Sequence, residues 1–138
     1  ELLDRDAADG RSREQLAGLM VGLIVRISEY VKAARPGFLV FPQNSPELAE
    51  VGGYVDAVDG IGMEELFYEA TDEPCTADYC AENLRGAQAL KRAGKTVLAV
   101  DYALDRGHRS DACTRARREG FIPYVTSVDL DSLTSTCP

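Results

Sequence analysis

Hydrophobic and polar positions along this chain follow a pattern that predicts a long helix near its start. Apolar residues recur at steps of three and four from Leu16 to Val31, the spacing of one helix face. Ser12, with Gln15 three residues later, forms a capping-box sequence before this stretch, and Pro36 ends it. The wide apolar stripe predicts that this helix packs against a sheet or another helix.

Shorter apolar runs further along the chain predict four strands separated by helices. Continuous apolar residues are typical of parallel strands that are buried on both faces. Strands that alternate with helices predict right-handed βαβ units and a parallel sheet. The expected strands are 38–41, about 57–61, 96–100 and 121–125; the expected helices are about 78–93 and 110–119, with shorter helical turns in 46–54 and 129–133.

Polar residues follow each predicted strand. The carboxyl ends of parallel strands share one edge of a sheet, where α/β folds build their active sites, so we expect these side chains to converge. Glu64 is the first candidate, because it follows a short apolar strand that ends on the glycines Gly60 and Gly62, and glycines allow close approach to the backbone. The other residues at this edge are Gln43, Asn44, Asp101, Tyr102, Thr126 and Ser127.

Two architectures fit a single α/β domain over residues 1–138. One is a small open sheet of flavodoxin-like type, and the other is half of a (β/α)₈ barrel. A closed barrel needs about 250 residues, so 138 residues are too few for one. A half barrel leaves two bare sheet edges that a second chain has to cover. Periodicity alone leaves both architectures open.

Composition excludes several classes of partner. A net charge of −8 and a pI near 4.6 argue against binding to nucleic acid. No apolar run reaches the roughly 20 residues that a membrane span requires. The sequence begins at Glu1 without an initiator Met or a signal-peptide pattern, so we expect a processed chain or a piece of a longer one.

The four cysteines allow two interpretations. Cys75 and Cys80 flank a loop-like segment and are close enough in sequence for a small disulfide loop, which leaves Cys113 and Cys137 as a second pair. Disulfides would imply an oxidising compartment, and four reduced thiols are the alternative. A metal site of zinc type is not expected, because the chain has one His and no pair of Cys-x-x-Cys motifs.

Four segments in order carry a family resemblance: PGFLVFPQN at 36–44, VDGIGMEELFY at 58–68, GKTVLAVDY at 94–102 and GFIPYV at 120–125. This succession resembles the endo-α-1,4-polygalactosaminidase family of glycoside hydrolases, relatives of the spherulin-4-like proteins. The resemblance covers roughly residues 20–133. It implies a (β/α)₈ barrel of which this chain is the second half, with no cofactor.

The resemblance also implies a catalytic Asp and Glu, with the Glu at the position of Glu64. The Asp is expected at the end of an earlier strand, in a segment like "LDxxD". Only Glu1-Leu2-Leu3-Asp4 could match, with Glu1 where Asp is expected. Three alternatives stay open: Asp4 takes the role, the Asp lies upstream of the chain, or the site is degenerate.

Glycoside hydrolysis requires two carboxyl groups that flank the scissile bond. A half-buried carboxyl near another carboxylate such as Asp101 is expected to have a raised pKa, so we expect Glu64 to act as general acid or nucleophile. The alternative is that Glu64 caps the following turn. Gln43, Asn44, Asp101, Tyr102 and Tyr68 are candidate substrate contacts. Their alternatives are turn residues for the amides, a structural hydrogen bond for Asp101 and core packing for Tyr68.

The expected function is cleavage of a galactosamine-containing or related polysaccharide by an extracellular or secreted enzyme. The net negative charge suits a cationic polymer. A non-catalytic carbohydrate-binding or regulatory module is the alternative. A half barrel is expected to dimerise or to bind an N-terminal half chain that completes it.

Overall fold

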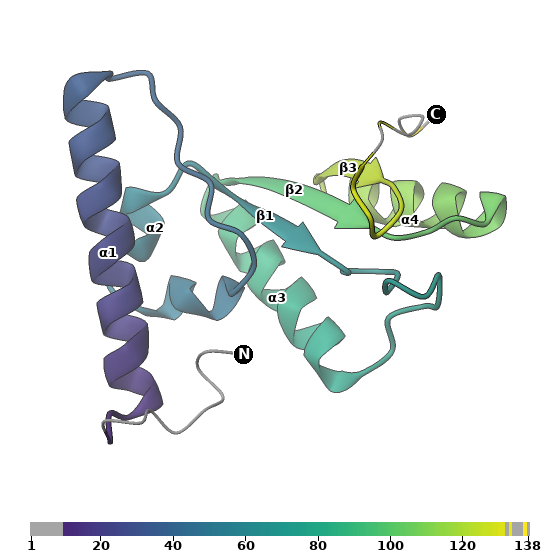
Figure 1. Ribbon diagram of the computed structural model, residues 1–138, viewed down its shortest axis with the longest axis horizontal. Coiled ribbons are helices and arrows are strands. Elements are labelled where there is room, and N and C mark those ends of the chain that lie inside the picture. The colour runs from purple at the N-terminus through teal and green to yellow at the C-terminus, as the bar shows by residue number, and fades with distance from the viewer. Residues whose placement is uncertain (1–9, 132, 134–136, 138) are drawn as a thin grey trace.

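The computed structural model describes residues 10–131, 133 and 137 (Figure 1). Three strands form one sheet, and helices precede and separate them. The elements in chain order are α1 (Arg13–Ala34), the 3₁₀ helix η1 (Pro46–Glu50), α2 (Tyr54–Ala57), β1 (Gly60–Glu64), α3 (Asp78–Arg92), β2 (Thr96–Asp101), α4 (Arg106–Arg118) and β3 (Ile122–Val125).

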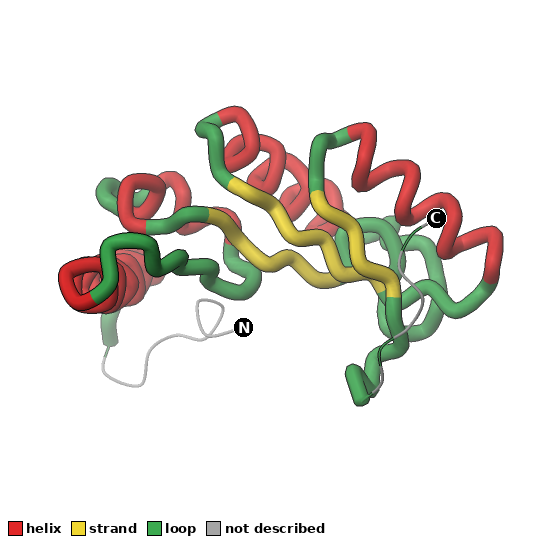
Figure 2. The backbone as a smooth tube through the Cα atoms, turned by 90° about the horizontal axis from the view of Figure 1, so that it is seen from above, coloured by secondary structure: helices red, strands yellow, loops and turns green. Residues whose placement is uncertain are grey.

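The sheet is parallel throughout, as the sequence predicted. Its strand order is β1-β2-β3, with Gly60 opposite Thr96 and Leu98 opposite Ile122. The two helices that connect these strands, α3 and α4, lie on the same face of the sheet (Figure 2). A flavodoxin-like sheet reverses its winding at a switch point, and the described residues contain no such reversal. The described units therefore wind in one direction, as successive β/α units of a barrel do.

Helix α1 begins at the predicted capping box. The Ser12 side chain accepts a hydrogen bond from the Gln15 backbone N–H, and the Gln15 side chain accepts one from the Ser12 N–H. The predicted apolar stripe packs only in part, because Val21 is 3% exposed whereas Leu19 and Leu23 are 54% and 51% exposed. The helix buries a narrower face than its wide stripe predicts.

Polar contacts tie the C-terminal half of α1 to the start of β1. The Ser28 hydroxyl donates to the Ala57 carbonyl at 2.6 Å, and the Lys32 ammonium lies 2.9 Å from an Asp59 oxygen. The Val40 N–H donates to the same Asp59 oxygen at 2.8 Å. These contacts fix the chain entering the sheet.

The predicted strand at 38–41 is wrong. The chain instead runs beside β1 as an irregular extended segment, with a parallel bridge at Gln43 and Gly62. The Asp59 N–H donates to the Val40 carbonyl and the Gly62 N–H to the Pro42 carbonyl, both at 2.9 Å. Pro42 has no N–H to donate, which is one reason that no regular ladder forms.

Other element boundaries differ from the predictions by a few residues. The second predicted strand starts at Gly60 instead of residue 57, because Tyr54–Ala57 forms helix α2. Helix α4 starts at Arg106 instead of residue 110, because Asp105 caps it by accepting from the N–H groups of Gly107 and His108. The predictions for α3, β2 and β3 are correct to within one residue at each end.

The two faces of the sheet differ in burial. Ile61, Met63, Val97 and Ala99 are fully buried, which assigns them to the face that α3 and α4 cover. Leu98 and Ile122, on the opposite face, are 36% and 57% exposed. Side chains alternate along a strand, so each strand residue can be assigned to the covered face or to this open face.

Both predicted disulfides are present. Cys75, in the loop before α3, pairs with Cys80 in the first turn of α3, and Cys113 of α4 pairs with Cys137. No helix within the described ranges combines the length and apolar character needed to cross a membrane.

Candidate functional site

Glu64 is the last residue of β1 and lies at the carboxyl edge of the sheet. The pairing places it opposite Val100 of β2, and Val100 lies opposite Tyr124 of β3. Glu64 and Val100 each lie two residues after Gly62 and Leu98, so their side chains point to the same face as Leu98. The Glu64 side chain therefore belongs to the open face. The carboxylate therefore stands where the sequence predicted a site.

Two side chains from distant parts of the chain hold the Glu64 carboxylate. The Tyr102 hydroxyl donates to Oε1 at 2.8 Å, and the Asn44 side-chain amide donates to Oε2 at 3.1 Å. Burial raises the pKa of Glu64, but hydrogen bonds from Tyr102, Asn44 and Gln43 favour the ionised form and outweigh it. The pKa of Glu64 is therefore lowered, and the expectation of a raised pKa was wrong.

Glycines in β1 admit the side chains of the neighbouring segment. A Cβ on Gly62 would collide with the side-chain oxygen of Gln43, and one on Gly60 would collide with the Phe41 ring and the Thr96 carbonyl. The predicted close approach to these glycines is thus made by the chain itself. It brings the Gln43 amide over β1, next to Glu64.

A cleft of about 1030 Å³ extends from Glu64 between η1 and α3. Its floor forms where Pro46 approaches Gly86, since a Cβ there would lie 2.7 Å from the Pro46 side chain. Two arginines, Arg13 and Arg85, also line the cleft. Five carboxylates outnumber them; these belong to Glu47, Glu50, Glu64, Glu65 and Glu82.

Comparison with known families identifies the chain. The sequence profile of glycoside-hydrolase family GH114 matches residues 10–138. The chain belongs to family GH114. This confirms the family resemblance drawn from the four sequence segments.

Three curated relatives of this GH114 chain are similar over most of its length. A protein of Deinococcus radiodurans is 36% identical over 114 residues, which are 83% of this chain and 37% of the relative. A Thermotoga maritima protein is 33% identical, and the match covers 87% of this chain and 40% of that protein. A Methanocaldococcus jannaschii protein is 30% identical, and the match covers 92% of this chain and 40% of that protein. All three are described as uncharacterized proteins. The chain spans less than half the length of each.

A solved structure supports the fold. The glycoside hydrolase domain of PelA from Pseudomonas aeruginosa superposes with a TM-score of 0.65 at 22% identity. The match covers 91% of this chain and 50% of that chain. The GH114 chain therefore has the α/β fold of about half of that domain.

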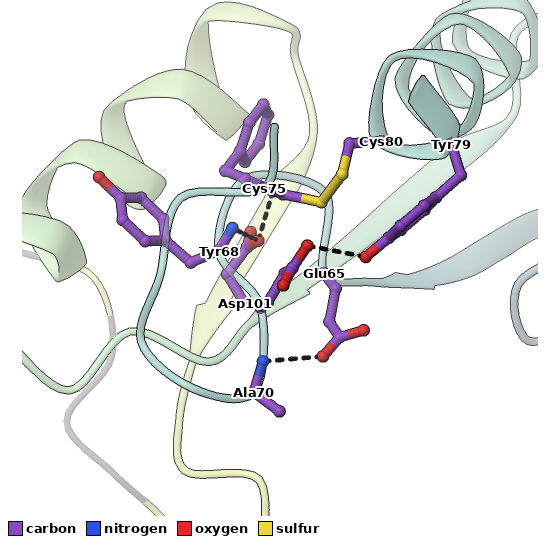
Figure 3. The surroundings of a disulfide bond; sticks show 9 residues. Glu65, Tyr68, Ala70, Cys75, Tyr79, Cys80 and Asp101 are labelled. Carbon is purple, nitrogen blue, oxygen red and sulfur yellow. Dashed lines mark hydrogen bonds between the residues drawn. A yellow bond between two sulfur atoms is a disulfide. The ribbon is translucent and has the colours of Figure 1, made fainter. Parts of the chain in front are cut away.

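The predicted substrate contacts separate into two groups. Gln43, Asn44 and Tyr102 gather around Glu64, whereas Asp101 and Tyr68 lie apart from it. Asp101 is 1% exposed, and one of its oxygens accepts from the backbone N–H groups of Phe67 and Tyr68 at 2.7 and 3.0 Å (Figure 3). Burial raises the pKa of Asp101. In this structure Asp101 binds the loop after β1.

Tyr68 faces α4. Its hydroxyl donates to Asp111 at 3.0 Å, and its ring stacks on His108 with centroids 4.9 Å apart. The His108 ring lies 3.2 Å from an oxygen of Asp72, which also accepts from the N–H groups of Leu104 and Asp105. These contacts join the loop after β1 to the loop after β2. The candidate Asp4 lies outside the described residues.

A metal site has little support. Within the described ranges, one set of possible ligands lies close together, namely Glu69, Cys75 and Cys80. Cys75 and Cys80 are joined in a disulfide (Figure 3), and the Tyr79 hydroxyl donates to Glu69 at 2.8 Å. These groups are already engaged with one another.

Sequence reasoning missed the wall of the cleft. Tyr79, Glu82, Asn83 and Gly86 line it from α3 at spacings of three and four residues, which marks one helix face. This polar face was visible in the sequence. This face becomes the wall of a cleft only because η1 packs against α3, and the sequence did not predict that packing.

Proposed function

We propose that this chain supplies one catalytic carboxylate, Glu64, and one wall of the substrate cleft of a glycoside hydrolase. The observation that carries the proposal is the ionised Glu64 carboxylate at the carboxyl edge of the sheet, held by Asn44 and Tyr102 at the end of an open cleft. Membership of family GH114 supports the reaction class. Catalytic groups of parallel α/β enzymes collect at this edge.

Glu64 acts in its unprotonated form. The side chains of Tyr102, Asn44 and Gln43 all donate hydrogen bonds to its oxygens, and these bonds stabilise the carboxylate. A carboxylate serves as nucleophile in a retaining glycosidase or as general base in an inverting one. The proton donor is then a second carboxyl group, supplied by Asp4 or by an Asp upstream of the chain.

The substrate is a cationic polymer that contains galactosamine. Five glutamates and two arginines line the cleft, which leaves an excess of three negative charges along its walls. Ammonium groups of a deacetylated amino-sugar polymer complement such a surface. Gln43 has two amide hydrogens, so it can donate one to Glu64 and offer the other to a sugar hydroxyl.

A substrate panel tests this proposal with the intact gene product. Release of reducing ends is measured on polygalactosamine, on its fully N-acetylated form and on a neutral α-glucan. We expect hydrolysis of polygalactosamine, weakened by N-acetylation because the ammonium groups are lost. Binding of the polymer without hydrolysis would refute the enzyme and support a carbohydrate-binding module instead.

The role of Glu64 has a separate test. The Glu64→Ala variant is compared on the polymer and on oligosaccharides with an activated aryl leaving group. An aryl group leaves without protonation, so loss of a general acid spares this substrate, whereas loss of a nucleophile or base does not. We expect Glu64→Ala to lose activity on both. Retained activity on the aryl substrate would assign Glu64 as the acid.

The chain works outside the cell as part of a larger (β/α)₈ barrel. Two disulfides support an oxidising compartment. Exposed apolar side chains at both sides of the sheet, such as Leu39 and Ile122 at 62% and 57%, support further β/α units beside it. An N-terminal half chain or a second copy supplies these units. Sedimentation of residues 1–138 as a compact monomer, with no complex formed, would contradict this assembly.

A further inference from the structure

Asn44 stands at the point where the segment beside β1 leaves the sheet. Gly62 donates to the Pro42 carbonyl at 2.9 Å and accepts from the Asn44 N–H at 2.7 Å, which is one rung of a parallel ladder. In a continued ladder, the Glu64 N–H would donate to the Asn44 carbonyl. It donates instead to the Asn44 side-chain oxygen Oδ1 at 3.0 Å.

The same side-chain amide reaches the Glu64 carboxylate. Its Nδ2 donates to Oε2 at 3.1 Å, while its Oδ1 holds the backbone of Glu64. One amide therefore holds both the backbone N–H and the side-chain carboxylate of Glu64. Free rotation of the carboxylate would break the bond from Nδ2, so the amide selects one orientation.

The backbone adopts a costly conformation to present this amide. Asn44 and Ser45 both have φ of 56°, in the left-handed region that residues other than glycine rarely adopt. Asn and Asp are the side chains that tolerate this region best. Strained residues of this kind cluster at functional sites, where the surrounding contacts hold them.

We propose that Asn44 is a positioning residue, whose side-chain amide replaces the next rung of the β1 ladder in order to orient the Glu64 carboxylate. This inference rests on the proposed role of Glu64. It also changes the predicted role of Asn44, because both ends of its amide are occupied by Glu64. Gln is one methylene longer, and Asp lacks the donor, so neither reproduces both bonds.

Three variants test the proposal. Asn44→Asp keeps the backbone tolerance and the acceptor for the Glu64 N–H, but it replaces the donor with a like charge. Asn44→Gly keeps the backbone conformation and removes both bonds. Asn83→Asp is the matched control, since it adds the same charge to the wall of the same cleft, and Asn83 makes no hydrogen bond to Glu64 in the described contacts.

The direct readout is the pKa of the Glu64 carboxyl group. It is measured in each variant by an NMR titration that follows the chemical shift of the carboxyl carbon. A like charge within hydrogen-bonding distance raises a carboxyl pKa by about one unit or more, so Asn44→Asp should do so while Asn83→Asp moves it less. The acid limb of the kcat/KM profile should shift in the same direction. Asn44→Gly should lower kcat by about tenfold, the scale of one hydrogen bond to a charged group, with KM nearly unchanged.

Failure of this inference is distinguishable from failure of the proposed function. If Glu64→Gln abolishes hydrolysis but Asn44→Asp leaves the Glu64 pKa and the acid limb where they were, Asn44 does not position the carboxylate. If Glu64→Gln leaves hydrolysis intact, the proposed function fails. The NMR titration then still decides whether Asn44 holds Glu64.

Discussion

Replacing Asp101 with Ala distinguishes a structural carboxylate from a substrate contact. Asp101 is 1% exposed and accepts from two buried backbone N–H groups, those of Phe67 and Tyr68. Ala leaves both donors without an acceptor. Each unsatisfied buried donor costs about 1–3 kcal/mol, so the free energy of unfolding should fall by about 2–6 kcal/mol. A typical domain has about 5–15 kcal/mol in total, so the loss is large.

Asp101→Asn is the companion variant. Its amide oxygen can still accept from both N–H groups, and we expect a loss of about 1 kcal/mol. Urea unfolding of the oxidised protein, followed by circular dichroism, measures the loss of unfolding free energy in both variants. Asp129→Ala is the control, because Asp129 is exposed. A cost below 1 kcal/mol for Asp101→Ala, together with a large loss of hydrolysis, would refute the structural role and restore the predicted substrate contact.

Two further predictions concern stability. Replacing Cys113 and Cys137 with Ser should lower the free energy of unfolding by about 3.5 kcal/mol, and replacing Cys75 and Cys80 by about 2 kcal/mol. The difference arises because the first disulfide closes a separation of 24 residues and the second a separation of 5. Equal losses in urea unfolding would contradict the chain-entropy reasoning. Stability should also fall with acid. Although burial opposes it, hydrogen bonds from Lys32 and Val40 lower the pKa of Asp59, and those from Asp105, His108 and Leu104 lower the pKa of Asp72. Because these folded-state pKa values lie below the unfolded ones, the stabilisation is present above about pH 4 and is lost as pH falls through the folded values. Thermal unfolding from pH 7 to pH 2 should show this loss, and an Asp59→Asn, Asp72→Asn double variant should flatten it.

The sequence predicted the elements whose signals are local. The capping box at Ser12 marked the start of α1, and apolar runs before polar residues marked β2 and β3. The segment 38–41 failed as a strand because its outcome depends on Pro42 and on the left-handed turn at Asn44. Both features act on hydrogen bonds to another part of the chain.

The strand-end position of Glu64 was predicted, but the contacts of the candidate site were not. Glu64 could be placed at a strand end, but its pKa depends on Asn44, 20 residues earlier, and on Tyr102, 38 residues later. Asp101 and Tyr102 are neighbours in sequence, so strand alternation requires that they face opposite sides. Which of them faces Glu64 follows from the side that α3 covers, and the pattern of one sequence does not give that side.

Hydrolysis of polygalactosamine by the Glu64→Gln variant tests the central claim most directly. Gln keeps the size of the side chain and removes its charge, and Glu73→Gln, an exposed position in the loop after β1, is the control for the same chemical change. Loss of a catalytic carboxylate should lower kcat by a factor of about 100 or more, with Glu73→Gln close to the unaltered enzyme. Hydrolysis by Glu64→Gln at the rate of the unaltered enzyme would contradict the assignment of Glu64 as a catalytic residue.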